Sequence, residues 1–138
     1  MSGQYTATVN LTVPISPGEF LDKLTILEIK AERITDPAKL ENVRRELEAL
    51  HVVWQASPLS SRDVRAQVDQ LREVNAALWD IEDRIREKEA AKTFDAAFVE
   101  LARSVYRTND RRAAIKKELN LMLGSELIEE KSYSKYER

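Results

Sequence analysis

The sequence predicts an all-α protein, an antiparallel four-helix bundle of two unequal helical hairpins with one short N-terminal β-strand. Three observations support this fold class. Apolar residues recur every three or four positions through most of the chain, as in amphipathic helices. Serine, aspartate and proline stand where such helices would begin. Charged residues make up 33% of the 138 residues, which suits long helices with solvated faces.

The first predicted element is the segment YTATVNLTV (5–13), which alternates apolar and polar residues. A period of two is typical of a half-buried strand. A single strand cannot satisfy its own backbone, so three partners are open: the same segment of a second copy, residues near 57–60 of this chain, or a strand of another protein. Residues 1–14 are therefore expected to form an arm of a single helical domain spanning 1–138.

Two shorter helices are expected next. SPGE at 16–19 has the serine, proline and glutamate of a capping box, and the helix that it begins runs to about Ile34. The dipeptide DP at 36–37 caps and opens a second helix. The link between them is very short, so these helices should form an antiparallel hairpin.

Two longer helices are expected at about 62–92 and 94–123, and Gly124 is a natural C-terminal stop before a polar tail at 125–138. At 1.5 Å per residue they are about 45 Å long, against about 27 Å for the first pair. The short hairpin therefore cannot cover the long one along its whole length. A second copy that covers the remainder predicts a homodimer.

The seam between the two long helices is polar in the middle. Folding the chain near Thr93 places Asn75 opposite Arg112, and the lean of helical side chains predicts a Glu82–Arg112 ion pair. Two interpretations are open: a buried polar layer that fixes helix register, or a pocket for a small anionic ligand. The candidate ligand-binding residues are Asn75, Trp79, Glu82, Arg86, Asn109, Arg112 and Lys116.

A second candidate site is the charge on the first helix, namely Glu19, Asp22, Lys23, Glu28 and Lys30. Ordinary surface charge is the alternative interpretation. The start of this helix also offers backbone N–H groups that could hold a phosphate, although capping by Ser16 and Glu19 competes for them.

Nucleic acid and membrane are not expected as partners. The net charge is only −2, with acidic and basic residues interspersed. Arg103, Arg107 and Arg111 form one basic stripe, but acidic residues interrupt it, so a solvated face is the favoured interpretation. No apolar run approaches the roughly 18 residues of a membrane span, and no signal peptide is visible, so a cytoplasmic protein is expected.

Metal and cofactor sites are not predicted. The chain has no cysteine and one histidine, which excludes disulfides, thiolate zinc sites and cysteine nucleophiles. Three glycines leave no room for a glycine-rich phosphate loop. Whether the protein is an enzyme stays open.

Four motifs, SPGEFLDKLTILEIKAERI, LWDIEDRIREKE, VYRTNDRRAAIKKELN and GSELIEEKSY, resemble a family of small uncharacterised helical proteins found mainly in proteobacteria. The resemblance covers residues 14–136 and implies a bacterial source. The family has no established activity, so the resemblance assigns no catalytic residue. Its polar or aromatic motif positions are Glu19, Asp22, Lys23, Glu28, Lys30, Trp79, Glu82, Arg86, Asn109, Asp110, Arg112, Lys116, Glu130 and Lys131.

Three functions fit these observations. The first is a non-catalytic assembly or adaptor protein that acts through self-association. The second is a binder or enzyme for a small anionic ligand, such as a phosphate-bearing sugar or nucleotide, held in the polar cluster between the long helices. The third is a nucleic-acid accessory protein.

Overall fold

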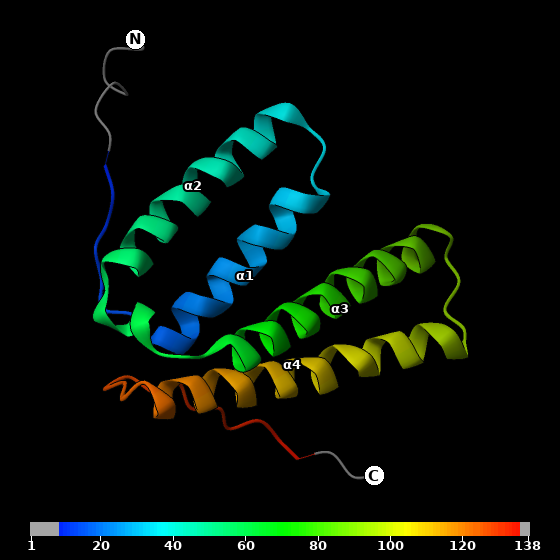
Figure 1. The fold of residues 1–138 in the computed structure, drawn as a ribbon. Helices are drawn as coiled ribbons and strands as arrows, with labels where there is room; N and C mark the ends of the chain where they lie inside the picture. Colours follow the sequence, from blue (N-terminus) through cyan, green and yellow to red (C-terminus); the bar gives the residue numbers. More distant parts are fainter. Residues whose placement is uncertain (1–8, 136–138) are drawn as a thin grey trace.

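The computed structural model describes residues 9–135, and these residues form four α-helices, one short 3-10 helix and no strand (Figure 1). The elements are α1 (Pro17–Arg33), α2 (Pro37–Ala56), η2 (Pro58–Ser61), α3 (Arg65–Ala90) and α4 (Ala96–Met122). Within the described part of the chain, none of these helices combines the length and apolar character needed to cross a membrane.

Helices α1, α2 and α4 begin where the sequence provides a cap, whereas α3 begins after Val64 without a side-chain cap. The Ser16 hydroxyl accepts a hydrogen bond from the backbone N–H of Glu19 at 3.2 Å, and the Asp36 carboxylate accepts one from Lys39 at 3.0 Å. A proline fills the first position of both α1 and α2, where a missing N–H costs nothing. The predicted helix boundaries are confirmed to within three residues.

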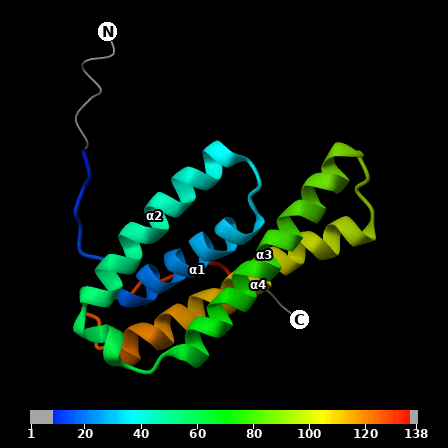
Figure 2. The ribbon, with the colours of Figure 1, turned by 45° about the horizontal axis from the view of Figure 1, so that its top comes forward.

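The two hairpins are unequal, as predicted, with α1 and α2 of 17 and 20 residues and α3 and α4 of 26 and 27. Helix α1 is central, because it packs against α2, α3 and α4 (Figures 1 and 2). Helix α2 approaches α1 and η2 but neither α3 nor α4. It therefore forms an outer layer on α1 instead of closing against the long hairpin.

The hydrophobic core lies at one end of the long hairpin. Its buried residues are Phe20, Leu21, Leu24, Val64, Leu71, Val74, Ile115, Leu119 and Leu123. Trp54 joins this core from α2 by stacking on Phe20, with ring centroids 6.0 Å apart. The core thus gathers the first half of α1, the first half of α3 and the end of α4.

The predicted register of the long hairpin is confirmed by contacts of α4 with α3 and with the residues just before it. The Arg62 guanidinium donates to the backbone oxygen of Met122 at 3.0 Å, and the Gln67 amide donates to the Glu118 carboxylate at 3.3 Å. Both pairs fit a chain that folds back near Thr93. Periodicity was sufficient here because the apolar residues of the first half of α3 and of the last half of α4 match when the chain folds back.

The predicted N-terminal strand is wrong for residues 9–13, which have no regular structure. These residues are exposed, and Leu11 is 91% accessible to solvent. Residues 5–8 of the prediction lie outside the described residues. The internal partner near 57–60 is not available, because residues 58–61 form the helical turn η2. Alternation gives a strand only where a neighbouring backbone supplies hydrogen bonds, and the described residues supply none here.

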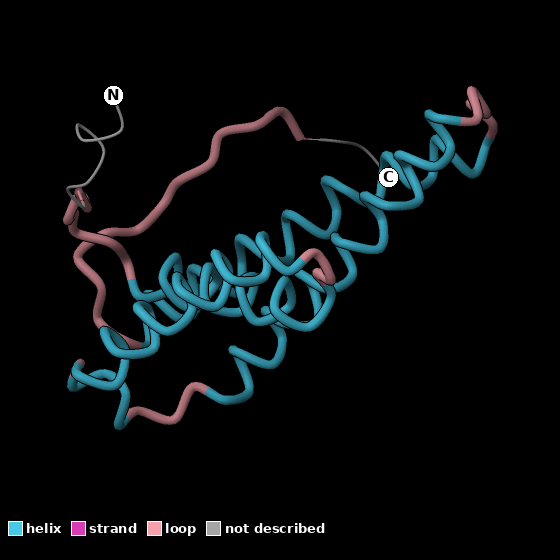
Figure 3. The backbone as a smooth tube through the Cα atoms, turned by 90° about the horizontal axis from the view of Figure 1, so that it is seen from above, coloured by secondary structure: helices cyan, strands magenta, loops and turns pink. Residues whose placement is uncertain are grey.

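The predicted polar tail reverses direction after α4. Gly124 has a φ of +69°, a conformation that glycine adopts at no steric cost. Residues 125–135 then run back along the helices without regular structure (Figure 3). This reversal brings the tail over the junction of α1 and α4.

Helices α1 and α4 approach closely at Gly18. The Gly18 N–H donates to the Asn120 side-chain oxygen at 2.7 Å. A Cβ on Gly18 would overlap the backbone oxygen of Lys116 and lie 2.8 Å from the Asn120 side-chain oxygen. Only glycine therefore allows this contact without a shift of one helix.

Gly18→Ala should destabilise the protein by about 1–3 kcal/mol, because the added methyl forces α1 and α4 apart. At an exposed helical position, the same substitution would instead stabilise by up to about 1 kcal/mol. Urea unfolding followed by circular dichroism measures the difference. A Gly18→Ala variant as stable as the unmodified chain would show that the two helices are not in this contact.

Candidate functional site

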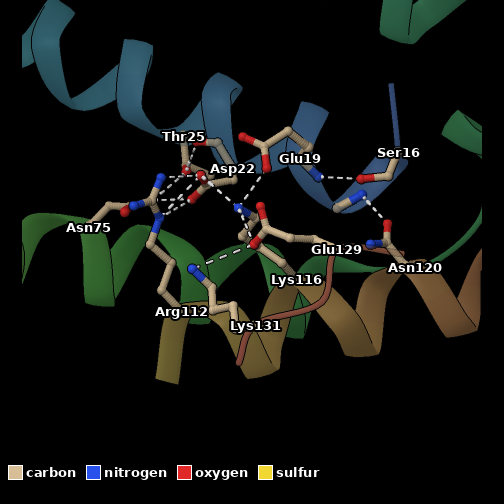
Figure 4. A network of polar contacts seen from close by, with 11 residues as sticks. Ser16, Glu19, Asp22, Thr25, Asn75, Arg112, Lys116, Asn120, Glu129 and Lys131 are labelled. Atoms are coloured by element: carbon tan, nitrogen blue, oxygen red, sulfur yellow. Dashed lines mark hydrogen bonds and ion pairs between the residues drawn. The ribbon is translucent and has the colours of Figure 1, made fainter. Parts of the chain in front are cut away.

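A buried carboxylate lies at the centre of the polar residues that join the helices. The Asp22 side chain, on α1, is only 1% exposed and faces both α3 and α4 (Figure 4). From α4, the Arg112 guanidinium donates through Nε to Oδ1 at 2.9 Å and through Nη2 to Oδ2. From α3, the Asn75 amide donates to Oδ1 at 2.9 Å. One carboxylate thus bonds residues from both helices of the long hairpin.

Thr25 completes the buried part of this arrangement. Its hydroxyl donates to the backbone oxygen of Asp22 at 2.7 Å and accepts from the Asn75 amide at 3.1 Å. A buried charge is costly unless it is paired and hydrogen-bonded, and here both conditions are met. The hydrogen bonds that Arg112 donates to Asp22 raise the pKa of Arg112 above its usual value, although partial burial opposes the shift. Arg112 therefore stays protonated.

Lys116 extends the arrangement toward the surface. Its ammonium lies 2.6 Å from the Glu19 carboxylate, 4.0 Å from that of Asp22 and 3.9 Å from that of Glu129 in the tail. We call the residues Glu19, Asp22, Thr25, Asn75, Arg112 and Lys116 the Asp22 network. Cations and carboxylates alternate in it, and across the described chain no buried side-chain nitrogen or oxygen lacks a hydrogen-bond partner.

The predicted Glu82–Arg112 ion pair is wrong. Arg112 pairs with Asp22, whereas the Glu82 carboxylate lies 3.6 Å from the Arg86 guanidinium on the surface of α3. The prediction considered α3 and α4 alone. Helix α1 lies over the seam between them and places a closer carboxylate against Arg112.

Four members of the first candidate set lie together around a pocket of about 250 Å³ between α1, α3 and α4. Its lining residues are Ile26, Ile29, Asn75, Leu78, Trp79, Glu82, Asp83 and Arg112. Two carboxylates face one guanidinium whose charge is already balanced by Asp22, so the pocket does not favour an anion. Arg86 is exposed beside Glu82, and Lys116 instead joins the opposite side of the network.

The second candidate set is divided between the network and the surface. Glu19 and Asp22 belong to the network. Lys23 lies 3.1 Å from Glu46, a surface pair between α1 and α2. Glu28 accepts a hydrogen bond from Arg72 of α3 at 2.6 Å, and Lys30 lies in the last turn of α1.

The start of α1 has no spare backbone donors at Gly18 and Glu19. The Gly18 N–H donates to the Asn120 side-chain oxygen at 2.7 Å, and the Glu19 N–H donates to the Ser16 hydroxyl at 3.2 Å. The phosphate site considered from the sequence is therefore already filled by side chains of the protein itself.

Comparison with known proteins places the chain in a family. A family of unknown function (DUF6165) matches residues 11–136. The chain belongs to this family. The predicted resemblance to an uncharacterised family is thereby confirmed, and membership brings no activity with it. No curated protein and no solved structure matches the chain.

Sequence reasoning missed three residues that hold this family member together, namely Thr25, Asn120 and Glu129. Gly18, Asp22 and Thr25 are spaced by four and three, which puts a small and polar face next to the apolar stripe of α1. That spacing was the available signal. Asn120 and Glu129 gave none, because their partners are 102 and 13 residues away in sequence.

The basic stripe on α4 is partly neutralised by an acidic residue within it. The Glu100 carboxylate lies 2.9 Å from the Arg107 guanidinium and 4.0 Å from that of Arg103.

Among the described residues, no group of three or more histidine, cysteine, aspartate or glutamate side chains lies close enough together to hold a metal ion.

Arg112→Leu should destabilise the protein by about 3–5 kcal/mol, because it leaves the Asp22 carboxylate buried without its charge partner. The double variant Asp22→Leu with Arg112→Leu should lose less than the sum of the single losses, since it leaves no unpaired charge. Urea unfolding of the four proteins gives the coupling energy.

Glu82→Gln is the matched control for the predicted pair that the structure does not contain. Its half-exposed side chain pairs with the exposed Arg86, so its effect should stay within about 0.5 kcal/mol. A large loss for Glu82→Gln, or additive losses in the cycle, would show that Arg112 has a different partner.

Proposed function

We propose that this protein is a non-catalytic assembly protein that acts by self-association, and that the outer half of the long hairpin is the surface it uses. This surface, residues 76–107, is called the distal hairpin. None of its residues is buried, whereas every buried residue of α3 and α4 lies outside it. This confinement of the core to one end of the hairpin is the observation that carries the proposal.

The distal hairpin has apolar side chains that its two helices alone do not cover. Phe94 is 57% exposed and Val99 45% exposed, and Phe94 makes an edge-to-face contact with Phe98 at 5.2 Å. Helices in proteins obtain most of their stability from packing an apolar face. A second copy that packs its distal hairpin against the first would bury the same patch on both copies, as a two-fold dimer does.

The tip of the distal hairpin is well defined by local contacts. The Asp95 carboxylate accepts from the backbone N–H of Phe98 at 2.9 Å and from the Lys88 ammonium at 2.9 Å. The hydrogen bond from Lys88 lowers the pKa of Asp95 most, and that from the Phe98 N–H lowers it further, so the pKa lies below its usual value. A preformed tip reduces the ordering cost of association.

The absence of catalytic machinery from the Asp22 network favours an assembly role over an enzymatic one. Its charged groups bind one another, and the Arg112 guanidinium is protonated throughout the physiological pH range. General acid–base catalysis needs a group that exchanges a proton near the working pH. The network instead joins three helices.

The unmodified chain should have about twice its 15.8 kDa mass in solution, measured by light scattering after size exclusion. The double variant Phe94→Asp with Val99→Asp should shift this mass to that of the monomer, because it places charges in the proposed contact while both positions are exposed in a single copy.

Leu121→Asp is the matched control for this double variant. It makes the same chemical change on α4, at a position that is 63% exposed and outside the distal hairpin, so the dimer should persist. A monomeric unmodified chain, or dissociation by Leu121→Asp alone, would contradict the proposed surface.

A further inference from the structure

The tail after α4 forms an acidic strap across the junction of α1 and α4. We give the name strap to residues 126–131. At its root, the Ser125 N–H donates to the backbone oxygen of Asn120 at 2.9 Å, and the Ser125 hydroxyl accepts from Leu127 at 3.1 Å. The chain then continues back along the helices in an extended path (Figure 3).

The strap contacts α4 through two adjacent glutamates and two adjacent lysines. Glu129 lies 3.9 Å from the Lys116 ammonium, and Glu130 lies 3.9 Å from that of Lys117. Glu129 is also 3.7 Å from Lys131 within the strap, and Figure 4 shows its carboxylate between Lys116 and Lys131. The pairing is therefore a match of charge pattern along two segments of the chain.

A groove of about 220 Å³ lies where the strap meets the body of the protein. On the body side its lining residues are Ser16, Glu19, Ala113, Ala114, Lys116, Lys117 and Asn120. The small side chains of the two alanines let an extended backbone come close to α4. Lys116 is largely covered and fixed by Glu19, whereas the side chain of Lys117 is 52% exposed.

We propose that the strap is a detachable wall of this groove, and that an extended acidic segment of a partner protein binds the exposed face of α4 in its place. The contacts themselves support detachment. Both ion pairs are long, at 3.9 Å, and the pair of Lys117 with Glu130 is exposed on both sides, so it is weak and screened by salt. The attachment of the strap to α4 gives it a high local concentration at this face.

The chemistry of the groove indicates a peptide carboxylate and not a phosphate as the ligand. The N–H groups of Gly18 and Glu19 at the start of α1 are occupied by Asn120 and Ser16, so a phosphate finds no backbone donors there. What remains is the half-exposed ammonium of Lys117 beside that of Lys116, which Glu19 also binds. The strap residues that line the groove are Glu129, Glu130 and Lys131, so their departure removes two carboxylates and one ammonium from it and leaves one more unit of positive charge.

Detachment can be measured on the full chain by a distance between two spin labels. The sequence has no cysteine, so Ser134→Cys and Arg111→Cys, both at exposed positions, provide unique labelling sites. We expect a narrow distribution at low salt that broadens when hexaglutamate is added, while hexaglutamine leaves it narrow. Lys117→Glu should broaden it without peptide, and Lys117→Glu combined with Glu130→Lys should restore it.

Binding of the acidic segment is tested by the fluorescence anisotropy of labelled hexaglutamate. Neutralising the strap with Glu129→Gln and Glu130→Gln should tighten binding by about tenfold, since a tethered competitor is removed. Lys117→Glu should abolish binding, while the control Lys39→Glu, an exposed change at the start of α2, should not. An unchanged affinity in the strap variant, or a distance distribution that hexaglutamate and Lys117→Glu both leave narrow, would overturn the proposal.

Discussion

The buried carboxylate of Asp22 constrains how three of the four helices can be arranged. A charge that is 1% exposed must have partners, and it takes them from α3 through Asn75 and from α4 through Arg112. The backbone contact of Gly18 with Asn120 adds a second fixed point one turn away on α1. Two such points determine both the height and the rotation of α1 on the long hairpin, so the apolar core forms in one register only.

The position of this junction also decides what the rest of the molecule can do. Because the network and the core occupy the same end, α1 ends before the long hairpin does. Arg33 in its last turn pairs with Asp80 at 2.8 Å, and the distal hairpin beyond this contact extends without a covering layer (Figure 2). The same end receives the returning tail, so the acidic strap lies directly over Lys116. The two surfaces for which we propose functions thus lie at opposite ends of α4 and can act independently.

The features that sequence reasoning predicted well are local ones. Caps and apolar periodicity determine where a helix begins and how two consecutive helices pair, so the boundaries, the hairpins and the register of α3 on α4 were predictable. The errors concern partners far away in sequence. Glu82 was paired with Arg112 because the position of α1 over the seam has no local signal. The N-terminal alternation gave no strand, because a strand also needs a neighbouring backbone. Asp22 was among the candidates, but its burial depends on three helices at once.

Helix α2 differs from the other helices because it packs only on α1 and η2 and has no buried residue. Its stability therefore depends on a single neighbour and on partly covered residues such as Leu47, Leu50 and Trp54. Elements with few buried contacts open at lower free energy than the whole molecule. The amide hydrogens of α2 should consequently exchange with solvent through a local opening that leaves α1, α3 and α4 assembled. The molecule then behaves as a three-helix cooperative unit with a fourth helix that can detach from it.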